Sequence, residues 1–287
     1  MDKINVKMVE FFDQHFYKCV YTPTDDEGNP KDEEITEYIP SVTSKLQIIE
    51  KPFLATWRGD IGNREADLRM VESQDRGSRL HLAWQVFTQG GAVVFNDYKK
   101  PAYTQQEIVD LEAKFSHIAI LRNQGEMYDM MKLQKFLDII KPTNTFSEMT
   151  VYDLVNKDAG TVDNLFEIAE GNYAISGVKP IHLIAGWYVY DLKTGKSAGD
   201  TARMQASAYA RIVKSMGTIE PIGCIIGHTG ATTKGGIAGF SADVFFEEEI
   251  AEEYQSYRLA ADLWLRKNGN KKPVVMEIPT LIFKEAK

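Results

Sequence analysis

An acid and a base stand two positions apart in the stretch VYDLKTGK, where the apolar run 181–190 ends. These residues are Asp191 and Lys193. Because side chains alternate along a strand, both would project from the same face. Together they could help to bind a cation, orient a water molecule or neutralise charge on a phosphate. An isolated Asp-x-Lys is common by chance as a surface ion pair, so the assignment depends on further residues.

A second acid lies among apolar residues in the preceding predicted strand, as Asp163 in GTVDNLF. If the strands 159–169 and 180–192 are neighbours, Asp163 and Asp191 can converge at one end of the sheet. Two close carboxylates repel each other, and a divalent cation relieves that repulsion. Hard oxygen ligands favour Mg²⁺ or Mn²⁺ over zinc. The alternative is that Asp163 lies in a turn and Asp191 makes an ordinary ion pair.

Three weaker signals accompany these acids. Each also has an ordinary explanation, as a half-exposed helix face, a core histidine or a solvated loop acid. A glycine one turn before a histidine would let a backbone or a phosphate approach the imidazole. The signals are the i, i+4 pair Gln205 and Tyr209, the i, i+4 pair Gly77 and His81, and Glu148 at the start of a predicted strand.

The order of these motifs resembles the RecB-like and phage-exonuclease branch of the PD-(D/E)XK nuclease superfamily. The series runs Gly-x-x-x-His, Glu, Gly-Thr-Val-Asp, Asp-x-Lys-Thr-Gly and Gln-x-x-x-Tyr over about residues 38–216. The segment IPSVTSKLQIIEKPFLATW looks like the Pro-Ser-Val-Thr opening of phage members. The resemblance implies an α/β fold with a restriction-endonuclease-like core, in which helices flank a central mixed sheet and an N-terminal helical segment precedes it.

The resemblance also implies a role for each residue. Mg²⁺ or Mn²⁺ would be held by His81, Asp163, Asp191 and the carbonyl group of Leu192, with Glu148 as a supporting catalytic acid. Lys193 would serve the attacking water, and Gln205 and Tyr209 would hold the lysine or the DNA backbone. The expected function is a metal-dependent deoxyribonuclease, an exonuclease of recombination, replication or repair such as phages encode.

The sequence departs from the family pattern in several ways. The interval from Asp163 to Asp191 is 28 residues, longer than the compact hairpin usual for the family, and the second acid is Asp rather than Glu. The cysteine cluster that holds an iron–sulfur centre in some relatives is absent, as is a helicase segment. A nuclease-like fold that only binds protein or DNA is the alternative function, but a decayed site would be expected to lose these acids or the lysine.

A nucleotide triphosphatase is not expected. The segment TGKS at 194–197 lacks the first glycine of a phosphate-binding loop, and Lys234 is followed by glycine rather than Ser or Thr. We therefore expect no bound nucleotide. The glycine-rich segment 229–239 is a candidate border of a DNA channel instead.

Composition sets the remaining expectations for this chain of 287 residues. Cys19 and Cys224 are its only cysteines and lie far apart, which favours a reducing compartment and argues against an iron–sulfur cluster. The N-terminus has no secretory h-region, and no apolar run is long enough to cross a membrane. We expect a cytoplasmic protein, with no membrane partner and with a homo-oligomer or a recombination or replication protein as possible partners.

The net charge of −8 is concentrated at the two ends of the chain, in residues 1–41 and 241–287. The middle of the chain is balanced, so a local basic face for DNA is possible alongside a mixed solvated surface. Arg76 and Arg79 are the preferred phosphate contacts, and Trp57 is either a base-stacking residue or a core aromatic. The candidate basic residues are Lys45, Lys51, Arg58, Arg64, Arg69, Arg76 and Arg79.

The chain is expected to consist of an acidic extension or hairpin, 1–41, and a single domain, 42–287, which the resemblance implies is a nuclease domain. Hydrophobic periodicity predicts its elements. In the helical part, 42–142, helices are predicted at 43–49, 53–60, 63–73, 75–88, 104–121 and 126–140. The sheet core, 147–228, should contain strands at 148–155, 159–169, 180–192 and 221–228, with a helix at 198–216. The C-terminal part, 240–287, should contain a helix at 247–268 and a strand at 273–284.

Overall fold

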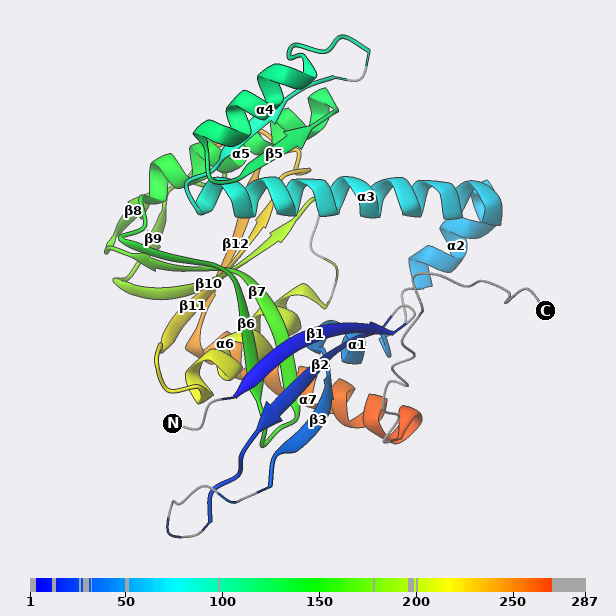
Figure 1. Cartoon of the computed structure of the whole chain (residues 1–287), viewed down its shortest axis with the longest axis vertical. Coiled ribbons are helices and arrows are strands. Elements are labelled where there is room, and N and C mark those ends of the chain that lie inside the picture. Colours follow the sequence, from blue (N-terminus) through cyan, green and yellow to red (C-terminus); the bar gives the residue numbers. More distant parts are fainter. Residues whose placement is uncertain are drawn as a thin grey trace, which may run out of the picture.

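A five-stranded mixed sheet lies at the centre of the computed structural model (Figure 1). The structure describes residues 4–11, 14–25, 27, 31, 33–49, 52–97, 99–177, 179–195, 199 and 201–269. The strand order is β12-β11-β10-β7-β6, and only β10 and β11 run parallel. The strands are β6 (Asn144–Asp153), β7 (Asp158–Ile168), β10 (Gly186–Lys193), β11 (Pro221–His228) and β12 (Ser241–Phe246).

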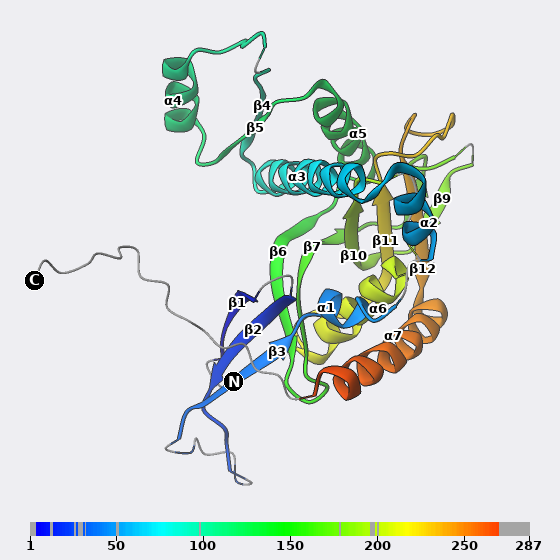
Figure 2. The same cartoon turned by 90° about the vertical axis from the view of Figure 1, so that its right-hand side faces the viewer.

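Strands β10 and β11 are apolar along most of their length because helices cover both faces of the sheet. A parallel pair needs a long crossover, and the helix α6 (Ala202–Ser215) supplies it. Together with α7 (Glu247–Asn268), α6 covers one face, where Val189 and Cys224 are buried. The other face, which includes Tyr188 and Tyr190, packs against α3 (Asn63–Thr88) and α5 (Gln124–Ile140) (Figure 2).

The helix α3 is continuous over 26 residues, so the prediction of two helices divided near residue 74 is wrong. Gly77 weakens the helix without ending it, and the helix ends before Gly90, which has a φ of 83°. The N-terminal half of α3 extends beyond the sheet together with α2 (Pro52–Ile61) (Figure 1). The C-terminal half packs over the sheet and presents Leu80 and Trp84 to the core.

The segment 92–121 is a small β-α-β unit on the side of α3 away from α6 and α7 (Figure 2). Its elements are β4 (Ala92–Phe95), α4 (Gln105–Lys114) and β5 (Ile118–Leu121). The predicted capping box is confirmed, because Thr104 and Glu107 each bond the other's backbone N–H. The prediction that this helix continues to residue 121 is wrong. Phe115 is extended, and β5 pairs in parallel with β4.

The N-terminal segment forms an antiparallel sheet of β1 (Asn5–Phe11), β2 (Gln14–Tyr21) and β3 (Ile35–Pro40), followed by the short helix α1 (Val42–Leu46). This sheet packs on β7, where Tyr17 Oη and Thr161 Oγ1 are 2.8 Å apart. The predicted strand 180–192 is two strands, β9 (Ile181–Leu183), which pairs with β8 (Gly171–Tyr173), and β10.

The predicted pairing of strands 159–169 and 180–192 is confirmed by the antiparallel contact of β7 with β10.

The predicted strand 273–284 lies outside the described residues. Among the described residues, no helix has the length and apolar character that a membrane span requires.

Candidate metal centre

The alternation of side chains is interrupted at Asp163 in β7 and at Glu148 in β6. Val162 packs in the core beneath α6 and α7, whereas Asn164 bonds Trp84 of α3 on the opposite face. Residues two positions apart in a regular strand would share a face. The β6 partners show the same reversal, since Met149 pairs with Val162 and Ser147 with Asn164.

Glu148 accommodates this reversal with a φ of 54°, in the left-handed region that non-glycine residues rarely adopt. The paired register of β7 with β10 stops at Asn164, the residue after Asp163, which pairs with Tyr190. The Asp163 carboxylate instead accepts a hydrogen bond from the backbone N–H of Leu192 in β10, at 2.7 Å. Backbone distortion of this kind is typical of functional sites.

The reversal brings three ligand-type side chains together. One ligand atom from each of His81, Glu148 and Asp163 lies within 4.8 Å of the other two, and this is the cation-type cluster found among the described residues. His81 Nδ1 is 3.4 Å from Asp163 Oδ1. The cluster therefore unites α3, β6 and β7, and Glu148, whose sequence signal was the least specific, belongs to it.

The electrostatics of the cluster fit a divalent cation. Burial and the neighbouring Asp163 carboxylate raise the pKa of Glu148 to about 7. Burial would also raise the pKa of Asp163, but His81, Lys193 and the Leu192 N–H outweigh burial and lower it. Burial would lower the pKa of His81, but Asp163 raises it overall. An ionised Glu148 is therefore short of positive charge, which a bound cation would provide.

Asp191 and Lys193 lie beside this cluster on the face covered by α6. Lys193 Nζ is 2.7 Å from Asp191 Oδ2, and Gln205 joins the pair from α6. Its amide donates to Asp191 Oδ1 at 3.1 Å and accepts from Lys193 Nζ at 3.1 Å. Burial raises the pKa of Asp191, and Asp163 raises it further, so the two aspartates interact electrostatically. Asp191 is not a member of the three-residue cluster, and its role as a metal ligand stays a prediction.

Lys193 is held in its charged form. Burial alone would lower its pKa, but Asp191 and Asp163 raise it overall. Tyr209 lies one turn beyond Gln205 and is buried, with its ring against Gly160 of β7. Burial raises the pKa of Tyr209 well above its ordinary value, while a hydrogen bond to Gln205 opposes that rise. Gln205 thus links the lysine, the aspartate and the tyrosine, and the Leu192 carbonyl remains a predicted ligand.

Arg76 and Arg79 lie on α3 close to His81 but form ion pairs with acids of α5. Arg79 Nη2 is 2.7 Å from Glu126 Oε1, and Arg76 pairs with Asp129. Both acids are almost fully buried, whereas the arginine side chains are 37% exposed for Arg76 and 43% exposed for Arg79. Within the protein these arginines hold α3 against α5. Part of each remains accessible to a phosphate.

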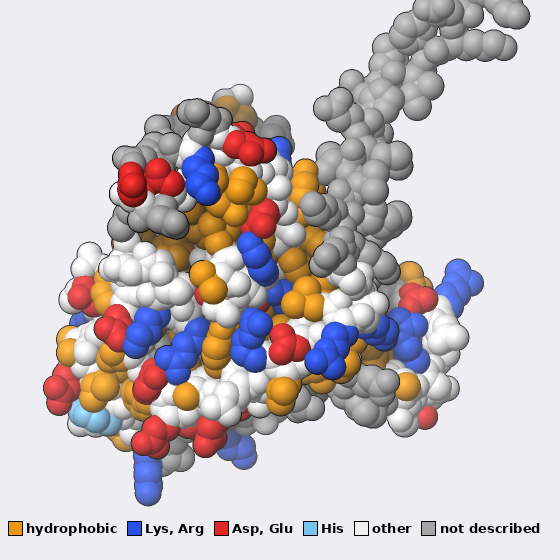
Figure 3. Space-filling view, turned by 90° about the horizontal axis from the view of Figure 1, so that it is seen from below, with side chains coloured by type: hydrophobic (Ala, Val, Ile, Leu, Met, Phe, Trp, Pro, Cys, Tyr) orange, Lys and Arg blue, Asp and Glu red, His pale blue; other side chains and the backbone are white. Residues whose placement is uncertain are grey.

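Most of the other candidate basic residues are also paired within the protein. Arg58 contacts Asp67 at 2.8 Å, and Arg69 contacts Glu65 at 2.8 Å. Lys45 is fully buried against Asp158, so it does not contribute to a basic surface. Lys51 lies outside the described residues. On the face seen in Figure 3, acidic and basic side chains are interspersed rather than gathered in one patch.

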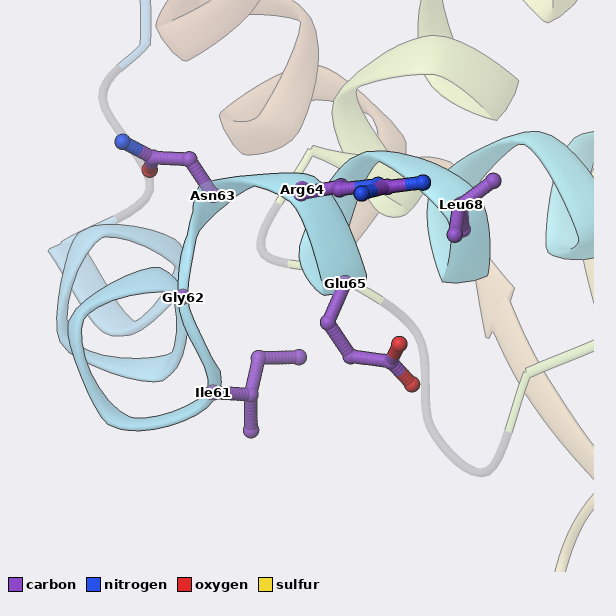
Figure 4. Close-up of a pocket in the computed structure, with 6 residues that line it drawn as sticks. All are labelled: Ile61, Gly62, Asn63, Arg64, Glu65 and Leu68. Atoms are coloured by element: carbon purple, nitrogen blue, oxygen red, sulfur yellow. The ribbon is translucent and has the colours of Figure 1, made fainter.

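A cavity of about 330 Å³ adjoins the lysine side of the site and lies between α1 and the start of α6. It is lined by Thr43, Leu46, Gln47, Lys193, Gly199, Thr201, Ala202 and Gln205. A second, open pocket lies at the corner between α2 and α3 (Figure 4), where Ile61 and Leu68 line it. Leu68 is 13 residues before His81, which places it about 20 Å away along the helix. Only the first cavity borders the candidate site.

The segment 229–239 packs near the same end of the sheet. Lys132 of α5 donates to the carbonyl of Thr229 at 2.6 Å, and Gly236 forms an isolated bridge with Ser176. The role of segment 229–239 as the border of a DNA channel stays a prediction.

Trp57 is half-buried in α2, which leaves both of its predicted roles open.

Sequence reasoning missed Asn164, although it directly follows Asp163. The signal was a lone amide in the apolar segment GTVDNLF, which in a buried strand requires hydrogen-bond partners.

Comparison with protein-family models gives no match for this chain, and no curated protein matches it either. The functional argument therefore rests on the geometry of the site.

Proposed function

We propose that the chain is a divalent-metal-dependent deoxyribonuclease with a restriction-endonuclease-like core, acting in the cytoplasm on DNA. One observation carries the proposal. A cluster of two acids and a histidine lies beside the pair of buried Asp191 and half-buried Lys193, and the three acids come from adjacent strands of one sheet. A purely structural Asp191–Lys193 ion pair would not account for Asp163 and Glu148 nearby, nor for the strained backbone of Glu148.

The residues present would hold the cation through His81, Glu148 and Asp163, with Asp191 at the edge of the cluster. A bound Mg²⁺ or Mn²⁺ would supply Lewis acidity and neutralise charge on the scissile phosphate. The Leu192 N–H fixes one oxygen of Asp163, which leaves its other oxygen directed at His81. The Asp163 carboxylate is therefore held in a defined orientation before a cation binds.

Lys193 would act on the attacking water. Its ammonium group is charged and is held by Asp191 and Gln205, so it can orient a water molecule through a hydrogen bond and stabilise charge on the phosphate. The cavity between α1 and α6 opens beside this lysine and gives space for the part of the substrate next to the scissile bond. We propose exonuclease action on DNA ends in recombination, replication or repair.

The decisive experiment is a time course on end-labelled linear DNA and on closed circular DNA, with Mn²⁺, with Mg²⁺ and with a chelator. Linear DNA should shorten only with metal, and circular DNA should persist. Asp163→Asn and Lys193→Ala should each abolish shortening and keep the wild-type circular dichroism spectrum. The matched control is Lys157→Ala, which breaks the exposed Lys157–Glu37 pair and should cut at the wild-type rate.

Two results would overturn the proposal. The first is wild-type cleavage by Asp163→Asn, and the second is no cleavage of any DNA by the wild-type protein with either metal. Tight DNA or protein binding without cleavage would favour the alternative, a nuclease-like binding module.

A further inference from the structure

A network of four polar side chains lies directly behind the metal cluster and connects β6, β7 and α3. Trp84 Nε1 donates to Asn164 Oδ1 at 2.5 Å, and the Asn164 amide donates to Ser147 Oγ at 2.8 Å and to Thr88 Oγ1 at 3.4 Å. The hydroxyl groups of Thr88 and Ser147 are 2.7 Å apart. Asn164 is fully buried and Trp84 is 1% exposed.

The network includes the immediate neighbour of each acid. Asn164 follows Asp163 in β7, and Ser147 precedes Glu148 in β6. Asn164 and Ser147 are cross-strand partners, so they leave the sheet on the same face, toward α3. On the far side of the acids, Val162 and Met149 are also partners, and they face the α6 and α7 core.

The Asn164–Ser147 pair faces α3, and the Val162–Met149 pair faces the α6 and α7 core. Side-chain alternation must therefore reverse at the acids between these two pairs. A buried amide is stable only where its donors and acceptor find partners, and α3 provides them on one face. The opposite face at this position is an apolar core, which suits Val162 and would leave the amide unpaired. One residue of each strand lies between the two pairs, Glu148 in β6 and Asp163 in β7, and the change of face occurs there. In β6 it coincides with the positive φ of Glu148.

We propose that Asn164 is a positioning residue for the metal cluster. Through Trp84, Thr88 and Ser147 it keeps β6 and β7 reversed, so that Glu148 and Asp163 turn toward His81. Asn164 touches neither metal nor substrate and acts only through the two acids. The identity of the cation rests on the proposed function, but the reversal itself does not.

The test compares Asn164→Leu with the wild-type protein. Leucine has a similar volume and no polar group, so residue 164 no longer needs partners on α3. In a crystal structure of the metal-free variant, Glu148 should return to a negative φ, and the three ligand atoms should separate beyond 4.8 Å. The Mn²⁺ affinity, measured by electron paramagnetic resonance, should fall about 10- to 100-fold.

A second pair of variants guards against an unfolded Asn164→Leu protein. Ser147→Ala removes one partner of the amide and should weaken Mn²⁺ binding by a smaller factor, whereas Ser147→Thr keeps the hydroxyl and should restore wild-type affinity. Tyr257→Phe is the control, because it removes a buried hydrogen bond to Asp158, which lies at the start of β7 and outside the Asn164 network. It should leave both the Mn²⁺ affinity and the conformation of Glu148 unchanged.

The outcomes separate the two proposals. A Leu variant that retains the positive φ at Glu148 would overturn the positioning role, as would an equal loss of affinity in Tyr257→Phe. If the wild-type protein binds no Mn²⁺, the proposed function fails. The conformation of Glu148 in the variant crystal structures then still decides whether Asn164 sets the reversal.

Discussion

Glu148 combines two unfavourable features that a structural residue would not need. Its backbone is in the left-handed region, which costs about 1–2 kcal/mol for a non-glycine residue. Its carboxyl group is partly buried beside Asp163, and its pKa is raised to about 7. Both features place a carboxylate where its charge is poorly compensated by the protein. The physical benefit is a strong local attraction for a cation.

The raised pKa predicts how stability depends on pH without metal. The folded protein holds the Glu148 proton up to about pH 7, whereas the unfolded chain releases it near 4.5, so stability must fall as the pH rises between these values. The fall attributable to Glu148 is at most about 3 kcal/mol. Urea unfolding of wild type and Glu148→Gln in a chelator, at pH 5 and pH 8, measures it.

His81 also titrates in this pH range, because Asp163 outweighs the effect of burial and raises its pKa above the ordinary value, so the informative quantity is the difference between the two proteins. Wild type should lose more stability than Glu148→Gln on going from pH 5 to pH 8, and Mn²⁺ should reduce the difference. Parallel pH profiles for the two proteins would show that Glu148 is not perturbed.

Gln205 provides a second prediction at this scale. Its side chain bonds both Asp191 and Lys193, and Gln205→Met would remove the bond that orients the ammonium group. We expect kcat for DNA cleavage to fall about 10- to 100-fold, because a small misplacement of a catalytic group is costly. The Mn²⁺ affinity should change little. A large loss of Mn²⁺ binding would instead make Gln205 part of the metal site.

The candidate site was only partly predictable from the sequence at the level of residues. Asp191 and Lys193 share a face because a strand alternates, and that inference needed nothing more than the apolar run before them. Glu148 and Asp163 meet because their strands stop alternating, which no periodicity can reveal. His81 joins them because α3 crosses the sheet at that point, which depends on tertiary packing.

At the scale of elements, α3 connects the site to the rest of the fold. It provides His81 to the cluster with Glu148 and Asp163, Trp84 to the network behind that cluster, and Arg76 and Arg79 to the buried acids of α5. A helix fixed along one side by ion pairs and a core aromatic residue can hold an imidazole in place. Arg76 and Arg79 thus have a structural role within the protein, which the sequence pattern alone did not suggest.

The Arg79–Glu126 pair predicts a measurable loss of stability. Arg79→Met would leave the Glu126 carboxylate, 1% exposed, without its guanidinium partner. Because the arginine itself is 43% exposed, we expect a loss of about 2 kcal/mol in urea unfolding rather than the larger value of a fully buried pair. Arg79→Met combined with Glu126→Gln should recover part of the loss. A stable Arg79→Met protein with weakened DNA binding would favour phosphate contact instead.

Long periodic elements were predicted better than short ones. The strand 221–228 and the helix 247–268 match β11 and α7 to the residue. The segment 104–121 was mistaken for one helix because its apolar spacing continues past Lys114, and only pairing with β4 makes its end a strand. The strands β1, β2 and β3 were not assigned, since half-exposed sheets with charged residues give a weak alternating signal.

For the whole molecule, a buried charge network joins elements that are distant in sequence. Lys45 of α1 donates to Asp158 of β7 at 2.5 Å, and Asp158 also accepts hydrogen bonds from Tyr257 and Arg258 of α7. Lys45 and Asp158 are both fully buried. The network therefore fixes α1 and α7 to the central sheet at Asp158, the first residue of β7, five residues before Asp163.

This network predicts an order of destabilisation. Asp158→Asn leaves Lys45 buried near Arg258 without the carboxylate that it pairs with, so it should cost most, about 3–5 kcal/mol. Lys45→Met leaves Asp158 with Arg258 and Tyr257 and should cost less, while Tyr257→Phe should cost about 1 kcal/mol. Urea unfolding at neutral pH measures all three.

The same variants test whether the charge network at Asp158 and the reversal at Asp163 are independent, although both lie on β7. Mutations at separated sites without shared partners act additively, so the Mn²⁺ affinity per folded molecule should stay at the wild-type value in each variant. Combining Tyr257→Phe with Asn164→Leu should then give the sum of the separate stability losses. A coupling energy well above 0.5 kcal/mol would mean that the charge network and the reversal at Asp163 form one unit, with β7 transmitting strain between them.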